Sequence, residues 1–169
     1  MNKETITKEF TEIIEKNQGI IFKVSAMYCN DFICREDLVQ EILLQLWKSF
    51  PSFDKTRKFT TWMYRIALNT AISQWRKDKT RKEVSTDKLP ITFSDDDINN
   101  EKNERVRILN IAINRLNKAE KSIIILYMDD YPYNEISEIT GISVSNVGVK
   151  INRIKKKLQN HLKELGYGL

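Results

Sequence analysis

The amino-acid sequence predicts an all-α protein made of two small helical domains that a flexible, acidic linker joins. Glycine and proline are scarce, with five and three copies in 169 residues, so long helical runs meet few breaks. Apolar residues recur at helical spacing through most of the chain. The charge reverses along it: residues 55–82 and 142–158 are basic, whereas residues 83–104 are mostly acidic. We therefore expect domains at residues 1–82 and 105–169, with the linker at 83–104.

The composition narrows the kinds of protein and of site to expect. A hydrophobic content of 41% supports a buried core, and a net charge of +5 favours anionic partners. No apolar run approaches the roughly 18 residues of a membrane span, and the N-terminus lacks a signal peptide's apolar core. We therefore expect a cytoplasmic protein that does not insert into membranes. Cys29, Cys34 and His161 are too few for a zinc site, so we expect no metal, no cofactor and two thiols in a reducing compartment.

The first two helices are expected at residues 7–27 and 35–50, where apolar residues recur every three or four positions. The face of the second helix opposite its apolar stripe presents Asp37, Gln40, Glu41, Leu44 and Trp47. Apolar anchors surrounded by acids and amides are common at interfaces, so this face is predicted to bind a partner protein. The alternative for Trp47 is that its indole packs on the N-terminal helix.

The third helix is expected at residues 59–77, after a loop that begins where Pro51 stops the second helix. The loop carries Phe53, Lys55, Arg57 and Lys58. Apolar residues occupy two faces of the third helix, and the polar stripe between them carries Trp62, Arg65, Asn69, Ser73, Arg76 and the adjoining Lys77. A stripe that carries cations and an indole is suited to bind a polyanion that carries planar rings. For the helix, the alternative is a core helix whose arginines only extend their charged ends to solvent. For the loop before it, the alternative is an ordinary solvated connection.

The second half of the chain ends in a predicted helix-turn-helix. Helices at residues 105–116 and 118–128 precede a short helix at 133–139. Gly141 supplies the positive φ of the turn, and Ser143 caps the last helix. The buried stripe of that helix is expected to be Val144, Val147, Ile151, Ile154 and Leu158. Its opposite face and flanks carry Ser145, Asn146, Gly148, Val149, Lys150, Asn152, Arg153 and Lys156. These residues suit the base edges and phosphates of duplex DNA, and the alternative is a helical hairpin that binds none.

Two blocks of the chain resemble regions two and four of the extracytoplasmic-function (ECF) sigma factors, the minimal members of the sigma-70 family. The first block, DLVQEILLQLWKSFPSFDKTRKFTTWMYRIALNTAISQWRK, is similar to region two throughout. The second, INRLNKAEKSIIILYMDDYPYNEISEITGISVSNVGVKINRIKKKL, is similar to region four. The resemblance implies a region-two bundle and a region-four helix-turn-helix. It also implies a detachable polymerase subunit for transcription initiation. One histidine and no convergent nucleophile, base or metal cluster argue against catalysis, so we expect no catalytic residues and no enzyme activity.

The resemblance further implies partners and a role for each predicted face. The outer face of the second helix falls where region two binds the β′ clamp helices of core RNA polymerase. The polar stripe and the loop before it fall where region two holds the −10 element and its separated non-template strand. The exposed face of the last helix falls where region four reads the −35 element. Further implied partners are the polymerase β subunit, promoter DNA in duplex and single-stranded form, and an anti-sigma factor.

The sequence departs from the family at two positions of the last helix. At Gly148 and Asn152 many relatives carry larger or more basic residues. Affinity for DNA is therefore expected to depend on phosphate contacts from Lys150 and residues 155–157, and Gly148 is expected to allow a close approach of the backbone to DNA.

The main alternative function is a stand-alone regulator that binds duplex DNA as a dimer through its helix-turn-helix. It accounts for the C-terminal half of the chain. It leaves the polar stripe of the third helix and the outer face of the second without a purpose.

Overall fold

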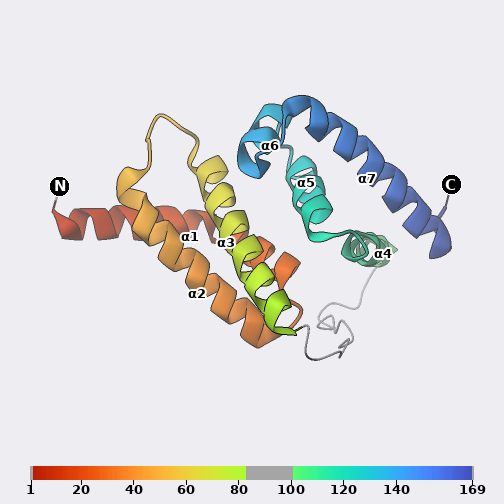
Figure 1. The fold of residues 1–169 in the computed structure, drawn as a ribbon, viewed down its shortest axis with the longest axis horizontal. Coiled ribbons are helices and arrows are strands. Elements are labelled where there is room, and N and C mark those ends of the chain that lie inside the picture. Colours follow the sequence, from red (N-terminus) through yellow and green to blue (C-terminus); the bar gives the residue numbers. More distant parts are fainter. Residues whose placement is uncertain (1, 83–100, 169) are drawn as a thin grey trace. The chain divides into compact units, whose positions relative to one another are not determined.

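The computed structural model describes residues 2–82 and 101–168, which form seven α-helices, one short 3-10 helix and no strand (Figure 1). The prediction of an all-α protein is confirmed. The chain divides into two compact units, Met1–Ile91 and Thr92–Leu169. Most of the predicted linker, residues 83–100, lies outside the described residues. Glu101 already belongs to a helix, so the helical part of the second unit begins before residue 105, where it was expected.

Three long helices pack against one another in the N-terminal unit (Figure 1). They are α1 (Lys3–Tyr28), α2 (Phe32–Ser49) and α3 (Phe59–Lys82), and the 3-10 helix η1 (Phe50–Ser52) follows α2. Their buried core includes Ile14, Ile21, Val24, Leu38, Ile42, Leu46, Met63, Tyr64, Ala67 and Leu68. Helix α2 begins before the expected residue 35 because the Asp31 side chain accepts the Cys34 N–H at 2.8 Å and caps it. The polar cap at Asp31 therefore starts this helix earlier than the apolar pattern alone predicts.

The turn between α1 and α2 carries a disulfide between Cys29 and Cys34, whose Cα atoms lie 5.6 Å apart. Cys29 is the C-terminal cap of α1, and Cys34 lies in the first turn of α2. The expectation that both cysteines remain thiols is therefore wrong for this structure. That expectation rests on the redox state of the compartment, whereas the pairing follows from the tight turn that brings the two side chains together.

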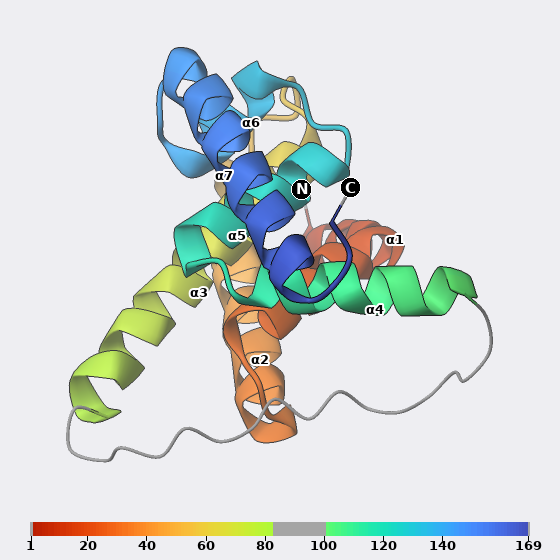
Figure 2. The same ribbon diagram turned by 90° about the vertical axis from the view of Figure 1, so that its right-hand side faces the viewer.

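The C-terminal unit consists of α4 (Glu101–Asn114), α5 (Lys118–Met128), α6 (Tyr133–Thr140) and α7 (Val144–Glu164), and α7 packs on the other three (Figures 1 and 2). Gly141 ends α6 with a φ of 77°, and the Ser143 side chain caps α7, which confirms the helix-turn-helix. Within the predicted stripe of α7, four residues are buried: Val147, Ile151, Ile154 and Leu158. Val144 is instead 48% exposed. It is the first residue of α7, and helical side chains lean toward a preceding turn that is absent there.

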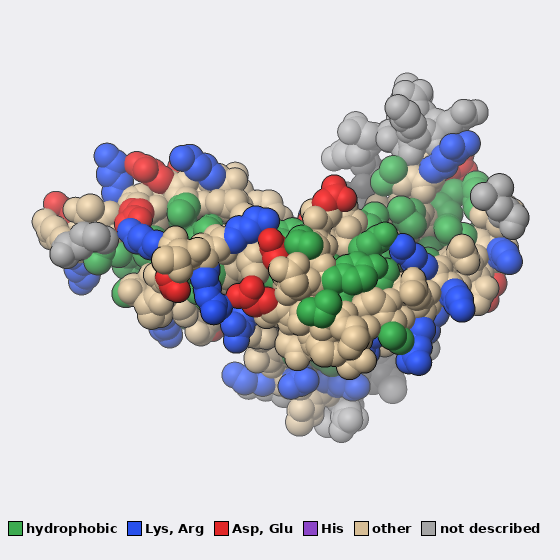
Figure 3. Space-filling model, turned by 90° about the horizontal axis from the view of Figure 1, so that it is seen from above, with side chains coloured by type: hydrophobic (Ala, Val, Ile, Leu, Met, Phe, Trp, Pro, Cys, Tyr) green, Lys and Arg blue, Asp and Glu red, His purple; other side chains and the backbone are tan. Residues whose placement is uncertain are grey.

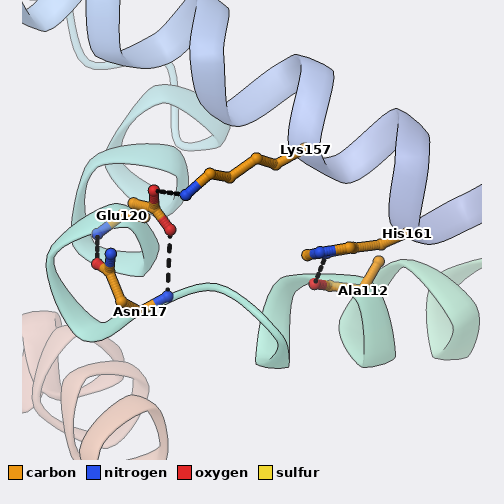
Figure 4. A network of polar contacts seen from close by, with 5 residues as sticks. All are labelled: Ala112, Asn117, Glu120, Lys157 and His161. Atoms are coloured by element: carbon orange, nitrogen blue, oxygen red, sulfur yellow. Dashed lines mark hydrogen bonds and ion pairs between the residues drawn. The ribbon is translucent and has the colours of Figure 1, made fainter.

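Polar contacts help to hold α7 on α4 and α5 (Figure 4). Asn117 caps α5 by accepting the Glu120 N–H at 2.9 Å, and the Glu120 carboxylate accepts the Asn117 N–H at 3.2 Å. The same carboxylate forms an ion pair with Lys157 of α7. His161 Nδ1 lies 3.3 Å from the Ala112 carbonyl oxygen of α4. The placement of α7 within its unit therefore depends on a capping box as well as on apolar packing.

Replacing Leu46 by Ala should destabilise the N-terminal unit by about 2–5 kcal/mol, because the side chain is fully buried and its loss leaves a cavity. All three tryptophans lie in this unit, so urea unfolding followed by tryptophan fluorescence reports on it. Leu44→Ala is the matched control, since Leu44 is 44% exposed and its loss should cost about 0.5 kcal/mol or less. Equal effects of the two substitutions would contradict the described core.

Alkylation should detect the disulfide between Cys29 and Cys34. In urea without reductant, the protein is expected to take up no iodoacetamide, because a disulfide sulfur is not a nucleophile. After reduction both cysteines should be labelled, as intact mass would show. Labelling of both before reduction would mean that the thiols are free.

Candidate nucleic-acid interface

The exposed surface of α3 is a narrow polar stripe at the predicted positions. Arg65, Asn69, Ser73 and Arg76 are exposed, and Lys77 adjoins them. The residues that flank the stripe are buried: Met63, Tyr64, Ala67, Leu68 and Ala71. Because a helix turns once every 3.6 residues, the exposed side chains follow one line along α3. Guanidinium, amide and hydroxyl groups on one line can meet successive phosphates and base edges of a strand.

Trp62 lies at the end of this stripe but is half-buried among other aromatic rings. The Phe53 and Phe59 rings lie 4.8 and 5.3 Å from the Trp62 ring. The ring centres of Phe10 of α1 and Trp47 of α2 lie 5.1 Å apart in an edge-to-face arrangement. The group, which we call the aromatic cluster, consists of Phe10, Trp47, Phe50, Phe53, Phe59 and Trp62. Its ring contacts join α1, α2, η1, the following loop and α3.

The loop before α3, residues 53–58, contains a turn that side-chain hydrogen bonds close. Asp54 Oδ1 accepts hydrogen bonds from the Thr56 hydroxyl at 2.7 Å and from the Thr56 N–H at 3.0 Å. These hydrogen bonds hold the pKa of the Asp54 carboxyl below its usual value. Lys55 Nζ donates to Glu9 Oε1 of α1 at 2.6 Å. The side chains of Arg57 and Lys58 are exposed, so the turn presents cations close to the start of α3.

The outer face of α2 differs in part from the prediction. Asp37, Gln40 and Leu44 are exposed. Glu41 is half-buried and accepts a hydrogen bond from Gln45 Nε2 at 2.8 Å. Trp47 is half-buried as well, because its ring packs on Phe10; this is the alternative that the sequence left open. Leu44 is therefore the exposed apolar side chain of this face, and Trp47 presents only part of its surface.

An open groove of about 870 Å³ lies between α2 and α3 and brings the two predicted faces together. Its α2 wall includes Asp37, Gln40, Glu41 and Leu44. Its α3 wall includes Asn69, Thr70, Ser73 and Lys77. One wall thus carries acids, and the other carries an ammonium group with amide and hydroxyl groups. Groups suited to a protein partner and groups suited to a nucleic acid meet at the same groove.

The outer face of α7 is exposed at all but one of the predicted DNA-reading positions. The exposed residues are Ser145, Asn146, Val149, Lys150, Asn152, Arg153 and Lys156. Gly148 is half-buried, and a Cβ on it would lie 3.4 Å from the Tyr133 ring. The Tyr133 ring therefore lies on the side of Gly148 toward which a Cβ would point, and the close approach of DNA to the Gly148 backbone stays a prediction. Tyr133, which is 38% exposed, was not among the predicted site residues because its proximity to Gly148 depends on how α6 packs on α7.

The three consecutive lysines of α7 differ in their surroundings. Lys155 donates to the Tyr127 hydroxyl at 2.8 Å and lies 4.3 Å from the ring centre, and this hydrogen bond raises the pKa of Lys155. Lys157 pairs with Glu120, as Figure 4 shows. Lys156 is exposed and makes neither a hydrogen bond nor an ion pair with another described side chain. On the face drawn in Figure 3, basic side chains are interspersed with acidic and apolar ones.

Two further properties concern the described residues as a whole. Within residues 2–82 and 101–168, no group of three or more His, Cys, Asp or Glu side chains is placed to hold a metal ion. Over the same ranges, no helix combines the length and the apolar character needed to cross a lipid bilayer.

Comparisons with known proteins match both units. The Sigma-70 region 2 family matches residues 13–81, and the Sigma-70, region 4 family matches residues 108–158. The chain is 26% identical over 168 residues to the ECF RNA polymerase sigma factor SigW of Bacillus subtilis (strain 168), with 92% of this chain and 90% of that protein covered.

Solved structures share the fold. The sigma factor RpoE in complex with the anti-sigma factor NepR, from Bartonella quintana, has a TM-score of 0.79 at 21% identity, with 92% of this chain and 98% of that chain covered. CnrH in complex with the cytosolic domain of CnrY has a TM-score of 0.67 at 17% identity, with 94% and 90% covered.

These matches agree with the residues that carry the predicted faces. The region 2 match contains the outer face of α2, the loop and the stripe of α3. The region 4 match contains α6, the turn at Gly141 and the exposed face of α7. With both regions present and in order, the chain belongs to the ECF group of the sigma-70 family and is a sigma factor of transcription initiation.

Proposed function

We propose that this sigma factor brings core RNA polymerase to two-part promoters and that its N-terminal unit opens the DNA at the −10 element. The observation that carries the proposal is the exposed stripe of α3, which follows the hydrogen-bonded loop 53–58. Unpaired bases require hydrogen-bonding or stacking surfaces, and their backbone requires cations. Arg65 and Arg76 supply the cations, whereas Asn69 and Ser73 supply groups for base edges.

The aromatic cluster refines the part proposed for Trp62. Its indole packs on rings of the loop and of α3, so one face of it supports the loop. It is only half-buried, which leaves indole surface for a base at the end of the stripe. Trp62 and Phe53 would therefore give the first unpaired base a rigid aromatic edge on which to stack.

The C-terminal unit is proposed to dock on duplex DNA at the −35 element through α7. Val149 is suited to a thymine methyl group, Asn152 to adenine and Arg153 to guanine. Lys150 and Lys156 are suited to phosphates and would add affinity without sequence preference. Because Tyr133 covers Gly148, we assign to Tyr133 the part of the surface that a larger side chain at 148 would occupy.

Core RNA polymerase is proposed to bind the exposed face of α2, with Asp37, Gln40 and Leu44 against the β′ clamp helices. The C-terminal unit would contact the β subunit. An anti-sigma factor is proposed as a further partner, because RpoE of similar fold was solved in complex with one. Action in the cytoplasm, without catalysis by this chain, follows from a role as a polymerase subunit.

Transcription with core polymerase on genomic DNA, followed by mapping of the 5′ ends, tests the proposal. New 5′ ends that share two upstream sequence elements are the expected result. A protein that binds promoter duplex specifically without core polymerase, and gives no new transcript with it, would instead be a stand-alone regulator. That alternative leaves the stripe of α3 and the face of α2 unused.

Removing the stripe should abolish most promoter opening. We expect the combined variant Arg65→Gln, Asn69→Ala and Arg76→Gln to lower opening by about tenfold or more, because each lost contact to a base or phosphate costs on the order of 1 kcal/mol. Permanganate reactivity of unpaired thymines measures opening. The control variant Lys8→Gln with Lys16→Gln removes two exposed cations from α1 and should open DNA normally. Normal opening by the stripe variant, in a holoenzyme that still assembles, would contradict the proposed role of α3.

Adjacent lysines of α7 should contribute unequally to DNA binding. Lys156→Gln is expected to weaken binding of the holoenzyme to promoter duplex and to lower the slope of log affinity against log salt by about one. Lys157→Gln should leave the slope nearly unchanged, because Glu120 already pairs with that ammonium group. Titrations at several salt concentrations give both slopes. Equal changes in the two variants would show that the ion pair does not withdraw Lys157 from DNA.

A further inference from the structure

We propose that Glu9 and Phe10 of the N-terminal helix are positioning residues for the loop 53–58, and that Lys55 tethers this loop to α1 instead of contacting DNA. The inference rests on the proposed function, in which this loop meets promoter DNA at its point of opening. Neither Glu9 nor Phe10 lies in the polar stripe or on the outer face of α2. Both lie on one turn of α1 and contact the loop or the segment from which it departs.

The first contact is the ion pair between Lys55 and Glu9. Lys55 Nζ lies 2.6 Å from Glu9 Oε1 and joins residues 46 positions apart in the sequence. Lys55 sits inside the turn that Asp54 and Thr56 close by hydrogen bonds. A restraint on this residue therefore restrains the whole turn. To bind a phosphate instead, the ammonium group would first have to leave a carboxylate partner.

The second contact is made by Phe10. Its ring centre lies 5.1 Å from that of Trp47 and 5.2 Å from that of Phe50, in edge-to-face arrangements. Phe50 is buried and begins η1, the segment from which the loop departs. The Trp62 ring lies 6.4 Å from Phe50 and 4.8 Å from Phe53, the first residue of the loop. Phe10 thus supports the loop at its start, while Glu9 holds its middle.

The two contacts together give the loop a shape before DNA arrives. Ordering the backbone of one residue costs roughly 1–2 kcal/mol, a cost that a free loop would meet during promoter opening. A loop already held by α1 avoids part of this cost, as preorganised binding surfaces do. Loss of the tether should therefore reduce the opening of duplex DNA. It should have little effect on DNA that is already open.

A charge exchange tests the tether. Glu9→Lys and Lys55→Glu are each expected to lower opening of a mapped duplex promoter by about two- to fivefold, the range available to an exposed ion pair. The double variant, which restores the pair in the opposite sense, should recover wild-type opening. On the same promoter with a mismatched bubble at the −10 element, holoenzymes that carry any of the three variants should bind the DNA with wild-type affinity. The control Glu12→Lys makes the same charge change at an exposed position of α1 and should have no effect.

An aromatic exchange tests the support from Phe10. Phe10→Leu is expected to lower opening of the duplex promoter but not binding to the bubble, whereas Phe10→Tyr, which keeps the ring, should open DNA normally. Phe22→Leu is the matched control, because Phe22 is on the same helix and 56% exposed. Urea unfolding of each variant, followed by tryptophan fluorescence, verifies that the N-terminal unit is folded in the assay.

Several results would overturn the inference. If the double charge variant opens DNA no better than Lys55→Glu alone, Lys55 acts on DNA through its own charge. If Glu9→Lys or Phe10→Leu lowers opening of the duplex and binding of the bubble equally, the residues only support the fold. If a folded Glu9→Lys variant opens the duplex normally, no tether is needed. A wild-type protein that opens no promoter with core polymerase would overturn the proposed function itself, which is a different outcome.

Discussion

On the proposed function, the N-terminal unit depends first on the packing of the aromatic cluster, which connects its three helices with the loop 53–58. Each helix of that unit supplies at least one ring, and the loop 53–58 leaves and rejoins the unit through Phe50 and Phe59. Aromatic pairs of this kind contribute about 0.5–1.5 kcal/mol each beyond the area they bury. Their sum is comparable with the entropy of ordering a short loop. The cluster thus helps to hold the two ends of the loop, together with the hydrogen bonds inside the turn and the ion pair between Lys55 and Glu9.

In the C-terminal unit, the packing of the helices as well as the sequence decides which lysines are available to bind a partner. The three lysines at the end of the basic segment are equivalent in a composition count, yet Tyr127 engages Lys155 and Glu120 engages Lys157. Both contacts attach α7 to α5. Such lysines stabilise the orientation of the helix that carries the proposed DNA-facing residues, whereas Lys156, which is exposed, makes neither kind of contact with another described residue. A net positive charge is therefore a poor measure of how many cations are available to phosphates.

The sequence predicted the features that depend on local periodicity and caps. The exposed line on α3, the turn at Gly141 and the cap at Ser143 follow from residues close together in the chain. The features that it missed join distant segments. Lys55 pairs with Glu9 and Tyr133 lies against Gly148, whereas the packing of Trp47 on the N-terminal helix was stated only as an alternative. No helical pattern reports such contacts, because each depends on how two helices, or a helix and a loop, are placed in space.

The groove between α2 and α3 brings opposite charges to one place, and this limits how a DNA strand can lie there. Asp37 and Glu41 on the α2 wall repel phosphates, whereas Lys77 on the α3 wall attracts them. On the proposed function, the backbone of the strand would therefore follow the arginines on the outer line of α3 and stay away from the α2 wall. A protein that covers the acids of α2 with its own cations would reduce this repulsion. Polymerase binding and strand capture would then favour each other, although their partners occupy different helices.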